Sequence, residues 1–353
     1  MGLKSHMADV LRLDRQTELR WLEIVVSSGL IVLPIGLGLL AGRLGMGLAV
    51  ATGALLAGNV TLHGSARARA EEIVLMTLSL FLACLVGGCL AGGGGWADMG
   101  LWGATTLAAL IGNFDRIAAI VTGRFIVFVV ILTEMARQAH HPHALVVPVM
   151  TGGILAACLI SALAKGVSAS APPAPGIGVG AKARRWVRSC RSLPACQFPL
   201  RLAVLMALTL SMDALWPERH VLWAALTVAL LCRRQLERVP IRASQRALGA
   251  SLGVLLSCLF LVHAPSRGEF ILFLAGLGIA SMVARKHNYM LYSMVATPLI
   301  MVLVGGGKTI GEAILVDRLV WTIAGAALLL AVNIVVVKMI RYCERRDIRP
   351  LCG

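Results

Sequence analysis

Residues 219–253 read RHVLWAALTVALLCRRQLERVPIRASQRALGASLG and give the clearest indication of the fold. It opens with an apolar run of helix length, crosses a turn rich in arginine, and returns to apolar sequence through small residues. Loops that carry many Lys and Arg residues stay on the cytoplasmic side of a membrane because they resist translocation. The stretch therefore predicts a membrane hairpin bent around a cytoplasmic turn, whose arginines are Arg233, Arg234, Arg238, Arg242 and Arg246.

The composition of the whole chain is that of a membrane protein. Of the 353 residues, 58% are hydrophobic and 14% are charged, and the mean hydropathy is +0.84. Soluble domains carry about 25% charged residues, so an ordinary soluble domain is excluded. The net charge of +16 lies in loops and termini between apolar segments. We interpret it as a signal of membrane topology and not of nucleic-acid binding.

The sequence offers no convincing site for a metal, a cofactor or a nucleotide. Its nine cysteines show no CxxC or Cys/His metal spacing, and the HHPH run at 140–143 lacks a defined ligand set. The run GGGKT at 305–309 resembles the end of a phosphate loop, but Val302 replaces the first glycine of that motif. We therefore expect no metal, no cofactor and no enzymatic activity.

Apolar segments fall into two sets of six, because a helix needs about 20 apolar residues to cross the hydrocarbon core. The first set lies near 22–40, 45–62, 73–91, 97–112, 117–135 and 144–164, and the second near 199–216, 220–232, 246–263, 270–284, 288–304 and 319–338. The predicted fold is an all-α polytopic membrane protein of about 12 transmembrane helices, arranged as two parallel six-helix repeats. Its expected parts are a cytoplasmic N-terminal segment (1–21), the first repeat (22–164), a cytoplasmic linker rich in Pro, Gly and Arg (165–198), the second repeat (199–338) and a basic cytoplasmic tail (339–353).

The positive charges support this topology. With both termini in the cytoplasm, the outside loops hold six cationic residues, namely Arg43, Arg137, Arg219, Arg267, Lys308 and Arg318. Most other Lys and Arg residues fall in the inside segments, as the positive-inside rule requires. Lys308 and Arg318 bracket the last outer loop, where they could attract anions.

The two halves of the chain also repeat each other. With a shift of 175 residues, Asn113 aligns with Asn288, Phe114 aligns with Tyr289, and Thr122 aligns with Thr297. A copy with an even number of crossings keeps its orientation, so the copies should be related by an axis along the membrane normal. Transporters built from repeats bind substrate near the membrane midplane between them.

Two charged residues inside or near the predicted spans are candidates for transport. Arg124 lies about seven residues into its span, roughly 10 Å from the cytoplasmic end at 1.5 Å per residue. Its guanidinium could bind a carboxylate by two parallel hydrogen bonds; the alternatives are snorkelling to the interface and pairing with a protein carboxylate. Asp213, near the outer end of its span, could couple transport to protons if burial raised its pKa, or it could be a hydrated carboxylate at a helix end. Asp98 and Glu134 are weaker candidates of the same kind.

Further candidates come from the repeat and from a proline. Asn113 and Asn288, the latter beside Tyr289, stand just inside the cytoplasmic face, where they could line an entrance or cap helices. Thr297 and Pro298 lie within a span, and proline frees a backbone carbonyl there, which predicts a broken helix beside the pathway. Gly249, Gly253 and Gly325 instead indicate close helix packing.

Several runs of the second half resemble the fusaric acid resistance family, which includes the aromatic acid exporters. They are WAALTV at 223–228, RALGASLG at 246–253, NYMLYSMVATPLIM at 288–301 and RLVWTIAGAAL at 318–328. The resemblance is clearest over 200–338. It implies an exporter of small aromatic or other organic acids in the bacterial inner membrane, often working with a periplasmic adaptor and an outer-membrane channel. Many members carry a sizeable cytoplasmic domain after each six-span block, so we expect this chain to be a compact member.

Three functions stay open at this point. The first is a proton-driven exporter of small organic anions, the second is a passive organic-anion channel, and the third is a membrane scaffold that transports nothing. The expected partners are the organic anion, the lipid bilayer, an adaptor with its outer-membrane channel, and further copies of the chain in a homo-oligomer; nucleic acid is not expected.

Overall fold

The computed structural model describes residues 3–13, 21–57, 66–138, 152–153, 155–156, 160, 179–190, 193–217, 219–262, 266–304 and 312–347. Within these ranges the chain forms α-helices, one short 3-10 helix and no strand, which confirms the predicted all-α class. The predicted span at 144–164 lies mostly outside the described residues.

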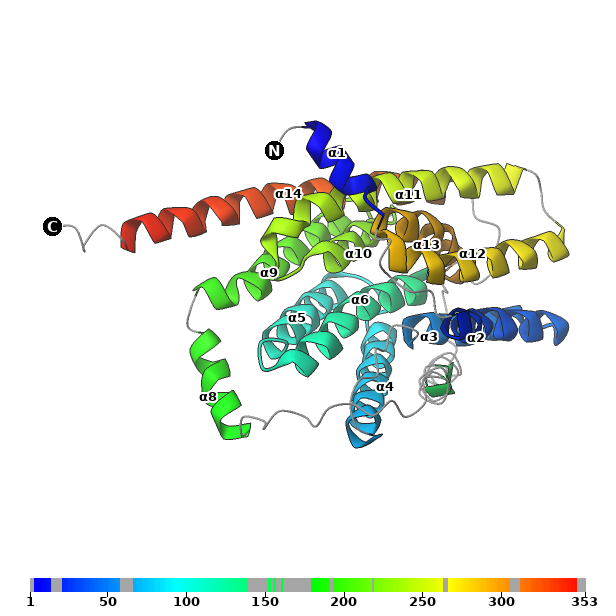
Figure 1. Cartoon of the computed structure of the whole chain (residues 1–353), viewed down its shortest axis with the longest axis horizontal. Helices are drawn as coiled ribbons and strands as arrows, with labels where there is room; N and C mark the ends of the chain where they lie inside the picture. Colours follow the sequence, from blue (N-terminus) through cyan, green and yellow to red (C-terminus); the bar gives the residue numbers. More distant parts are fainter. Residues whose placement is uncertain are drawn as a thin grey trace.

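The helices follow the chain in a simple order (Figure 1). The first half contains α1 (Leu3–Leu11), α2 (Trp21–Leu40), α3 (Leu44–Ala57), α4 (Ala66–Cys89), α5 (Gly95–Ile111) and α6 (Arg116–Gln138). The linker contributes α8 (Val179–Cys190). The second half contains α9 (Leu193–Leu215), α10 (Leu222–Leu231), the 3-10 helix η1 (Leu236–Arg238), α11 (Val239–Val262), α12 (Arg267–His287), α13 (Tyr289–Val304) and α14 (Glu312–Asp347).

Many of these helices are apolar enough for a membrane. Five described stretches are also long enough to cross one: Arg116–Arg137, Cys196–Leu215, Leu236–Phe260, Gly268–Arg285 and Ala313–Met339. Shorter apolar helices cover Ile24–Leu40, Leu44–Leu55, Ile73–Cys89, Leu222–Leu231 and Tyr289–Val302. The chain is a multi-pass membrane protein by these criteria.

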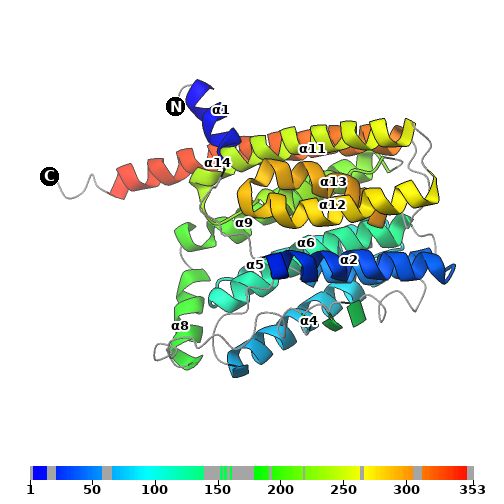
Figure 2. The same ribbon diagram turned by 45° about the vertical axis from the view of Figure 1, so that its right-hand side comes forward.

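The helices pack in pairs within each half and across the halves. In the second half, α11 packs against α13 and α14, and α10 packs against α14 and α9. In the first half, α2 packs against α3, and α4 packs against α6. The contacts between the halves include α2 with α12 and α5 with α9, which lie side by side in both views (Figure 1, Figure 2).

Glycines let α11 and α14 approach their neighbours at backbone distance. A Cβ on Gly249 would lie 2.4 Å from the carbonyl oxygen of Met290 on α13. A Cβ on Gly253 would lie 2.5 Å from the carbonyl oxygen of Met294, one turn further along α13. A Cβ on Gly325 would lie 2.7 Å from the carbonyl oxygen of Ala224 on α10. No side chain fits at such distances, so the close packing predicted for these glycines is confirmed.

The arginine-rich turn is shorter than the sequence predicts. Arg242 and Arg246 lie inside α11, which begins at Val239 and not near residue 246. Pro240 stands in the first turn of α11, where its missing N–H removes no helical hydrogen bond. A proline that suggests a turn in the sequence is therefore part of a helix start.

The apolar half of the predicted hairpin is a short internal helix. α10 has 10 residues, which span about 15 Å, or roughly half of the hydrocarbon core. Its residues from Leu222 to Val228 are all buried, because α6, α9 and α14 surround it. The expected crossing at 220–232 stays a prediction. The close pairing of α10 with α11 in a hairpin is wrong, since α10 packs mainly against α14 and α9.

The linker contains a helix that is fixed to the bundle. On α8, the Trp186 indole N–H donates to the carbonyl oxygen of Leu110 at 2.9 Å, and the Lys182 Nζ lies 3.1 Å from an oxygen of Asp115. Asp115 also caps α6 by accepting from the backbone N–H of Ala118 at 2.8 Å. Burial raises the pKa of Asp115, but these hydrogen bonds and the lysine charge outweigh burial and hold that pKa below its ordinary value.

Candidate functional site

A fully buried arginine on α14 is the most unusual charged group among the described residues. Arg318 is 0% exposed, and its Cζ lies 3.7 Å from the ring centroid of Trp223 on α10. Its Nε, Nη1 and Nη2 make no hydrogen bond with the described residues. The prediction that Arg318 lies in an outer loop is wrong, because α14 begins at Glu312 and carries this position into the bundle.

A second arginine is buried nearby on α11. Arg246 is 1% exposed, and its Nη1 donates to the Ser293 hydroxyl of α13 at 3.1 Å. Its Nε and Nη2 have no partner among the described residues. Arg246 lies within electrostatic reach of Arg318, so two cations repel each other in the interior of this apolar bundle.

A third buried arginine has a structural role. Arg201 on α9 is 1% exposed, and its Nη1 donates to the side-chain oxygen of Asn333 on α14 at 2.9 Å. Its Nη2 donates to the backbone carbonyl of Arg233. Arg201 therefore ties α9 to α14 and to the start of the arginine-rich turn, while Arg246 and Arg318 keep several donors without partners.

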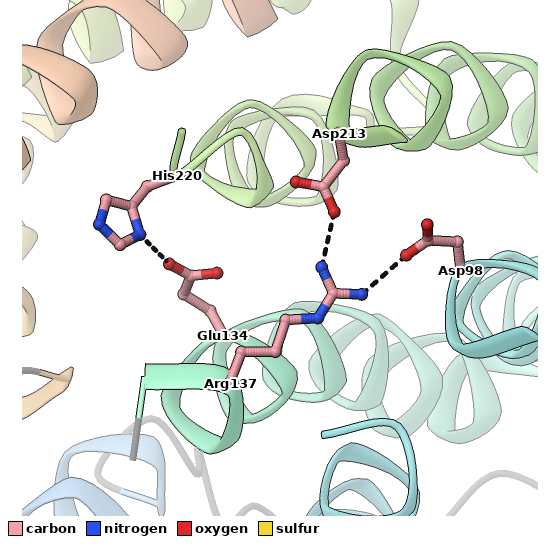
Figure 3. A network of polar contacts seen from close by, with 5 residues as sticks. All are labelled: Asp98, Glu134, Arg137, Asp213 and His220. Carbon is pink, nitrogen blue, oxygen red and sulfur yellow. Dashed lines mark hydrogen bonds and ion pairs between the residues drawn. The ribbon is translucent and has the colours of Figure 1, made fainter. Parts of the chain in front are cut away.

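Five polar residues meet at one end of the bundle, as Figure 3 shows. Arg137, at the end of α6, donates to Asp213 of α9 at 2.6 Å and to Asp98 of α5 at 2.7 Å. One turn earlier on α6, Glu134 lies 3.0 Å from the Nδ1 of His220. We call Asp98, Glu134, Arg137, Asp213 and His220 the Arg137 network. It joins α5, α6, α9 and the α9–α10 connection.

Charges around the Arg137 network favour protonation of its histidine. The hydrogen bond to the Glu134 carboxylate raises the pKa of His220, partial burial lowers it, and the carboxylates of Asp317 and Asp213 raise it again. The net result is a pKa above the ordinary histidine value. Asp317 itself lies 3.0 Å from Arg219, next to the buried Arg318. The network therefore reaches the α14 turn that carries the unpartnered guanidinium.

The structure separates the two charged residues predicted to act in transport. Arg124 is half-buried on α6, and its Nη1 donates to the sulfur of Met76 on α4 at 3.2 Å. Asp213 is held by Arg137 in the network at the far end of α6. These contacts involve neither Arg246 nor Arg318, and both predicted roles stay predictions.

The predicted entrance residues occupy helix ends. Asn113 is half-buried just after α5. Asn288 is buried, accepts from the backbone N–H of Met290 at 2.6 Å, and donates to the carbonyl oxygens of Val10 and Arg12. It therefore caps α13, the alternative that the sequence left open, and fixes the segment after α1.

The neighbouring aromatic ring faces a cation, and the predicted helix break is absent. The guanidinium of Arg242 lies 5.2 Å from the ring centroid of Tyr289. α13 continues through Thr297 and Pro298 to Val304. The Thr297 hydroxyl donates to the carbonyl oxygen of Ser293 at 2.7 Å. Both residues pack against Gly253, so tight contact with α11 holds this helix together at its proline.

The sequence does contain a signal for the two buried arginines that its interpretation missed. Small residues follow each arginine at helical spacing: Gly249 and Gly253 stand three and seven positions after Arg246, and Gly325 stands seven positions after Arg318. Positions separated in this way share one helix face. An arginine on the same face as closely packed glycines is therefore directed into the bundle.

Comparison with known proteins gives a match over the residues that hold the buried arginines. Residues 202–332 match the family described as fusaric acid resistance protein-like. No curated protein and no solved structure matches the chain. The match covers α10, α11, α12 and α13 completely, and it includes Trp223, Arg246 and Arg318. Over residues 202–332, the chain is similar to the fusaric acid resistance protein-like family.

Proposed function

We propose that this protein is a secondary transporter of the bacterial inner membrane that exports small aromatic or other organic acids. The observation that carries the proposal is the pair of buried arginines, Arg246 and Arg318, inside the family-matched residues 202–332. A cation inside a membrane bundle is costly and usually belongs to a substrate or ion pathway. Guanidinium groups with unused N–H donors suit the carboxylate of an organic acid.

The proposed architecture is two parallel six-helix repeats, about 12 crossings in all, with both termini in the cytoplasm. The shift of 175 residues places α2 over α9 and α5 over α12. It also places α4 over α11 and α6 over α13. Equivalent helices make equivalent contacts: α2 packs against α12 and α9 packs against α5, while α4 packs against α6 and α11 packs against α13. This reciprocity supports a repeat pair that moves one half against the other.

The proton gradient is the proposed source of energy, and the Arg137 network contains the titratable groups that could respond to it. Asp213 remains the predicted coupling residue within that network. A periplasmic adaptor and an outer-membrane channel are proposed partners because the resemblance to the aromatic acid exporters implies them, and further copies of the chain are proposed as well. One observation favours the alternative of a passive anion channel: Asp213 is held in an ion pair with Arg137.

The test is uptake of labelled fusaric acid and 4-hydroxybenzoate into inside-out vesicles, with and without an imposed proton gradient. We expect accumulation that requires the protein, depends on the gradient and disappears with a protonophore. Asp213→Asn should abolish accumulation and leave downhill flux. Downhill flux alone in the natural protein would identify a channel, and no flux above that of empty vesicles would contradict transport of these acids.

A further inference from the structure

We infer that Arg318, with Arg246 and the indoles of Trp223 and Trp321, forms a carboxylate-binding site in the interior of the bundle. The inference rests on the proposed function and names the residues at which the exported acid binds. Four helices contribute, since Ser293 of α13 orients the Arg246 guanidinium, and the remaining residues stand on α10, α11 and α14.

The strongest argument is the kind of polar atom that remains without a partner. Within the described residues, on the two arginines and on the Trp and Thr residues that stack on Arg318 or follow it on α14, these buried atoms are Arg318 Nε, Nη1 and Nη2, Arg246 Nε and Nη2, Trp223 Nε1, Trp321 Nε1 and Thr322 Oγ1. All except the threonine hydroxyl are pure donors. A buried donor without an acceptor is destabilising. A ligand that offers only acceptors, as a carboxylate does, satisfies this set.

The stacking of Arg318 leaves its hydrogen-bonding edge available. Because its Cζ lies 3.7 Å from the Trp223 ring centroid, the face of the guanidinium is used by the indole. The N–H groups point outward in the guanidinium plane, where they bind both oxygens of a carboxylate. Trp321 and Thr322 stand three and four positions after Arg318, on the same face of α14.

Charge in the surroundings also favours an anion. Arg246 and Glu134 both act electrostatically on Arg318. Glu134 is the carboxylate within reach, but it directs an oxygen to His220 at 3.0 Å and makes no hydrogen bond to the guanidinium. Among the described residues, no carboxylate is therefore hydrogen-bonded to either guanidinium, and this excess of positive charge favours a bound anion.

The described conformation encloses the site. Arg318 is 0% exposed and Trp223 is 1% exposed, so an anion reaches them only when α10, α11 and α14 move apart. Such an enclosed charge agrees with a transporter whose substrate site opens to one side at a time.

Isothermal titration calorimetry on the purified full-length protein in detergent tests the site. The probes are 4-hydroxybenzoate, fusaric acid and the neutral isostere 4-hydroxybenzamide. We expect saturable binding of the acids and none of the amide. Arg318→Gln should weaken binding of the acids about 10- to 100-fold, because it removes charge-assisted hydrogen bonds. Arg318→Lys should restore part of the affinity, since it keeps the charge and loses the planar fork.

Two further variants keep the test decisive if Arg318→Gln unfolds. Arg246→Lys retains the charge at the second arginine and should weaken binding by a smaller factor than Arg318→Gln. Arg43→Gln removes an exposed arginine of the α2–α3 connection and should bind as the natural protein does. Binding of the amide as tightly as of the acid, equal affinity in Arg318→Gln, or no binding of either acid would overturn the site.

The vesicle assay separates this inference from the proposed function. If the natural protein transports the acids and Arg318→Gln transports them equally well, the function stands and the site is wrong. If the acids bind in an Arg318-dependent way but no flux occurs, the site stands and the proposed export is wrong.

Discussion

The role of an individual arginine in this protein depends on whether its side chain is exposed or buried. Arg219 is exposed on a connection and pairs with Asp317, whereas Arg318, one position further along α14, is fully enclosed. Moving a cation from water into an apolar interior costs several kcal/mol even after relaxation. A protein that retains such a group without a carboxylate bonded to it is expected to use it, which is the physical basis of the anion site proposed above.

His220 gives the folded state a pH dependence whose sign follows from its contacts. Its pKa lies above the ordinary value because of the hydrogen bond to Glu134, and Asp317 and Asp213 add to the effect. The folded state therefore binds this proton more tightly than the unfolded state. The resulting stabilisation is complete below the ordinary histidine pKa of about 6.5. It is lost as the pH rises through the higher pKa of the folded protein.

We therefore expect the thermal unfolding midpoint in detergent to fall by roughly 1–3 °C more in the natural protein than in His220→Gln as the pH is raised from about 6 to about 9. Arg219→Gln, at the neighbouring position, should retain the full pH dependence because it leaves the His220–Glu134 hydrogen bond in place. Identical pH profiles for the natural protein and His220→Gln would show that this pair does not stabilise the fold.

The close spacing between α11 and α13 requires glycine, whose side chain is a single hydrogen atom, at the contact positions of α11. A Cβ at position 249 would stand 2.4 Å from the backbone oxygen of Met290, and backbone cannot rotate away as a side chain can. Gly249→Ala should therefore lower the free energy of unfolding by about 1–3 kcal/mol. The same change at Gly276 of α12, where nothing lies within 4 Å, should be neutral or stabilising by up to about 1 kcal/mol, because alanine favours helix.

Thermal unfolding of both variants in the same detergent provides the measurement. Equal midpoints for Gly249→Ala and Gly276→Ala would mean that α11 and α13 are not in close contact. Since Arg246 and Ser293 lie at this same interface, Gly249→Ala should also weaken binding of 4-hydroxybenzoate, whereas Gly276→Ala should not.

The joining of the two halves can be tested by a covalent bond between α2 and α12. A Cβ on Gly278 would lie 3.9 Å from the Cβ of Ile31, within the range of about 3.5–4.5 Å that disulfides require. The variant Ile31→Cys/Gly278→Cys, in a background without the natural cysteines, should therefore form a disulfide on mild oxidation in the membrane. The bond would connect residues 247 positions apart (278 − 31).

Mobility on denaturing gels and mass spectrometry of the linked peptides detect the product. Ile31→Cys/Gly276→Cys is the matched control, because Gly276 has no neighbour within 4 Å and should stay reduced. Efficient cross-linking of the control, or none in the test variant, would contradict the packing of α2 against α12. Vesicle transport that stops on oxidation and resumes on reduction would further show that the halves move relative to each other.

The class of the protein follows from its sequence alone, because hydropathy and the positions of charged residues along the chain can be read without any knowledge of packing. Apolar segments predicted helices in nearly the right places, the family resemblance is confirmed over residues 202–332, and Gly249, Gly253 and Gly325 were identified as packing positions. The site was predicted less well. Arg124 interrupts an obvious apolar run, so the sequence predicts it as the buried cation, while Arg246 and Arg318 lie beside charged turns and resemble loop residues.

Which charged side chains are buried, and which carboxylates lie close together, depends on how the helices pack. The enclosure of Arg318 depends on α10 being a short helix surrounded by α6, α9 and α14, and no local pattern encodes what surrounds a helix. The Arg137 network likewise draws Asp98, Arg137 and Asp213 from three helices. Hydropathy is a property of each segment by itself. The electrostatics of a site depends on the distances between segments, which are set only when the chain folds.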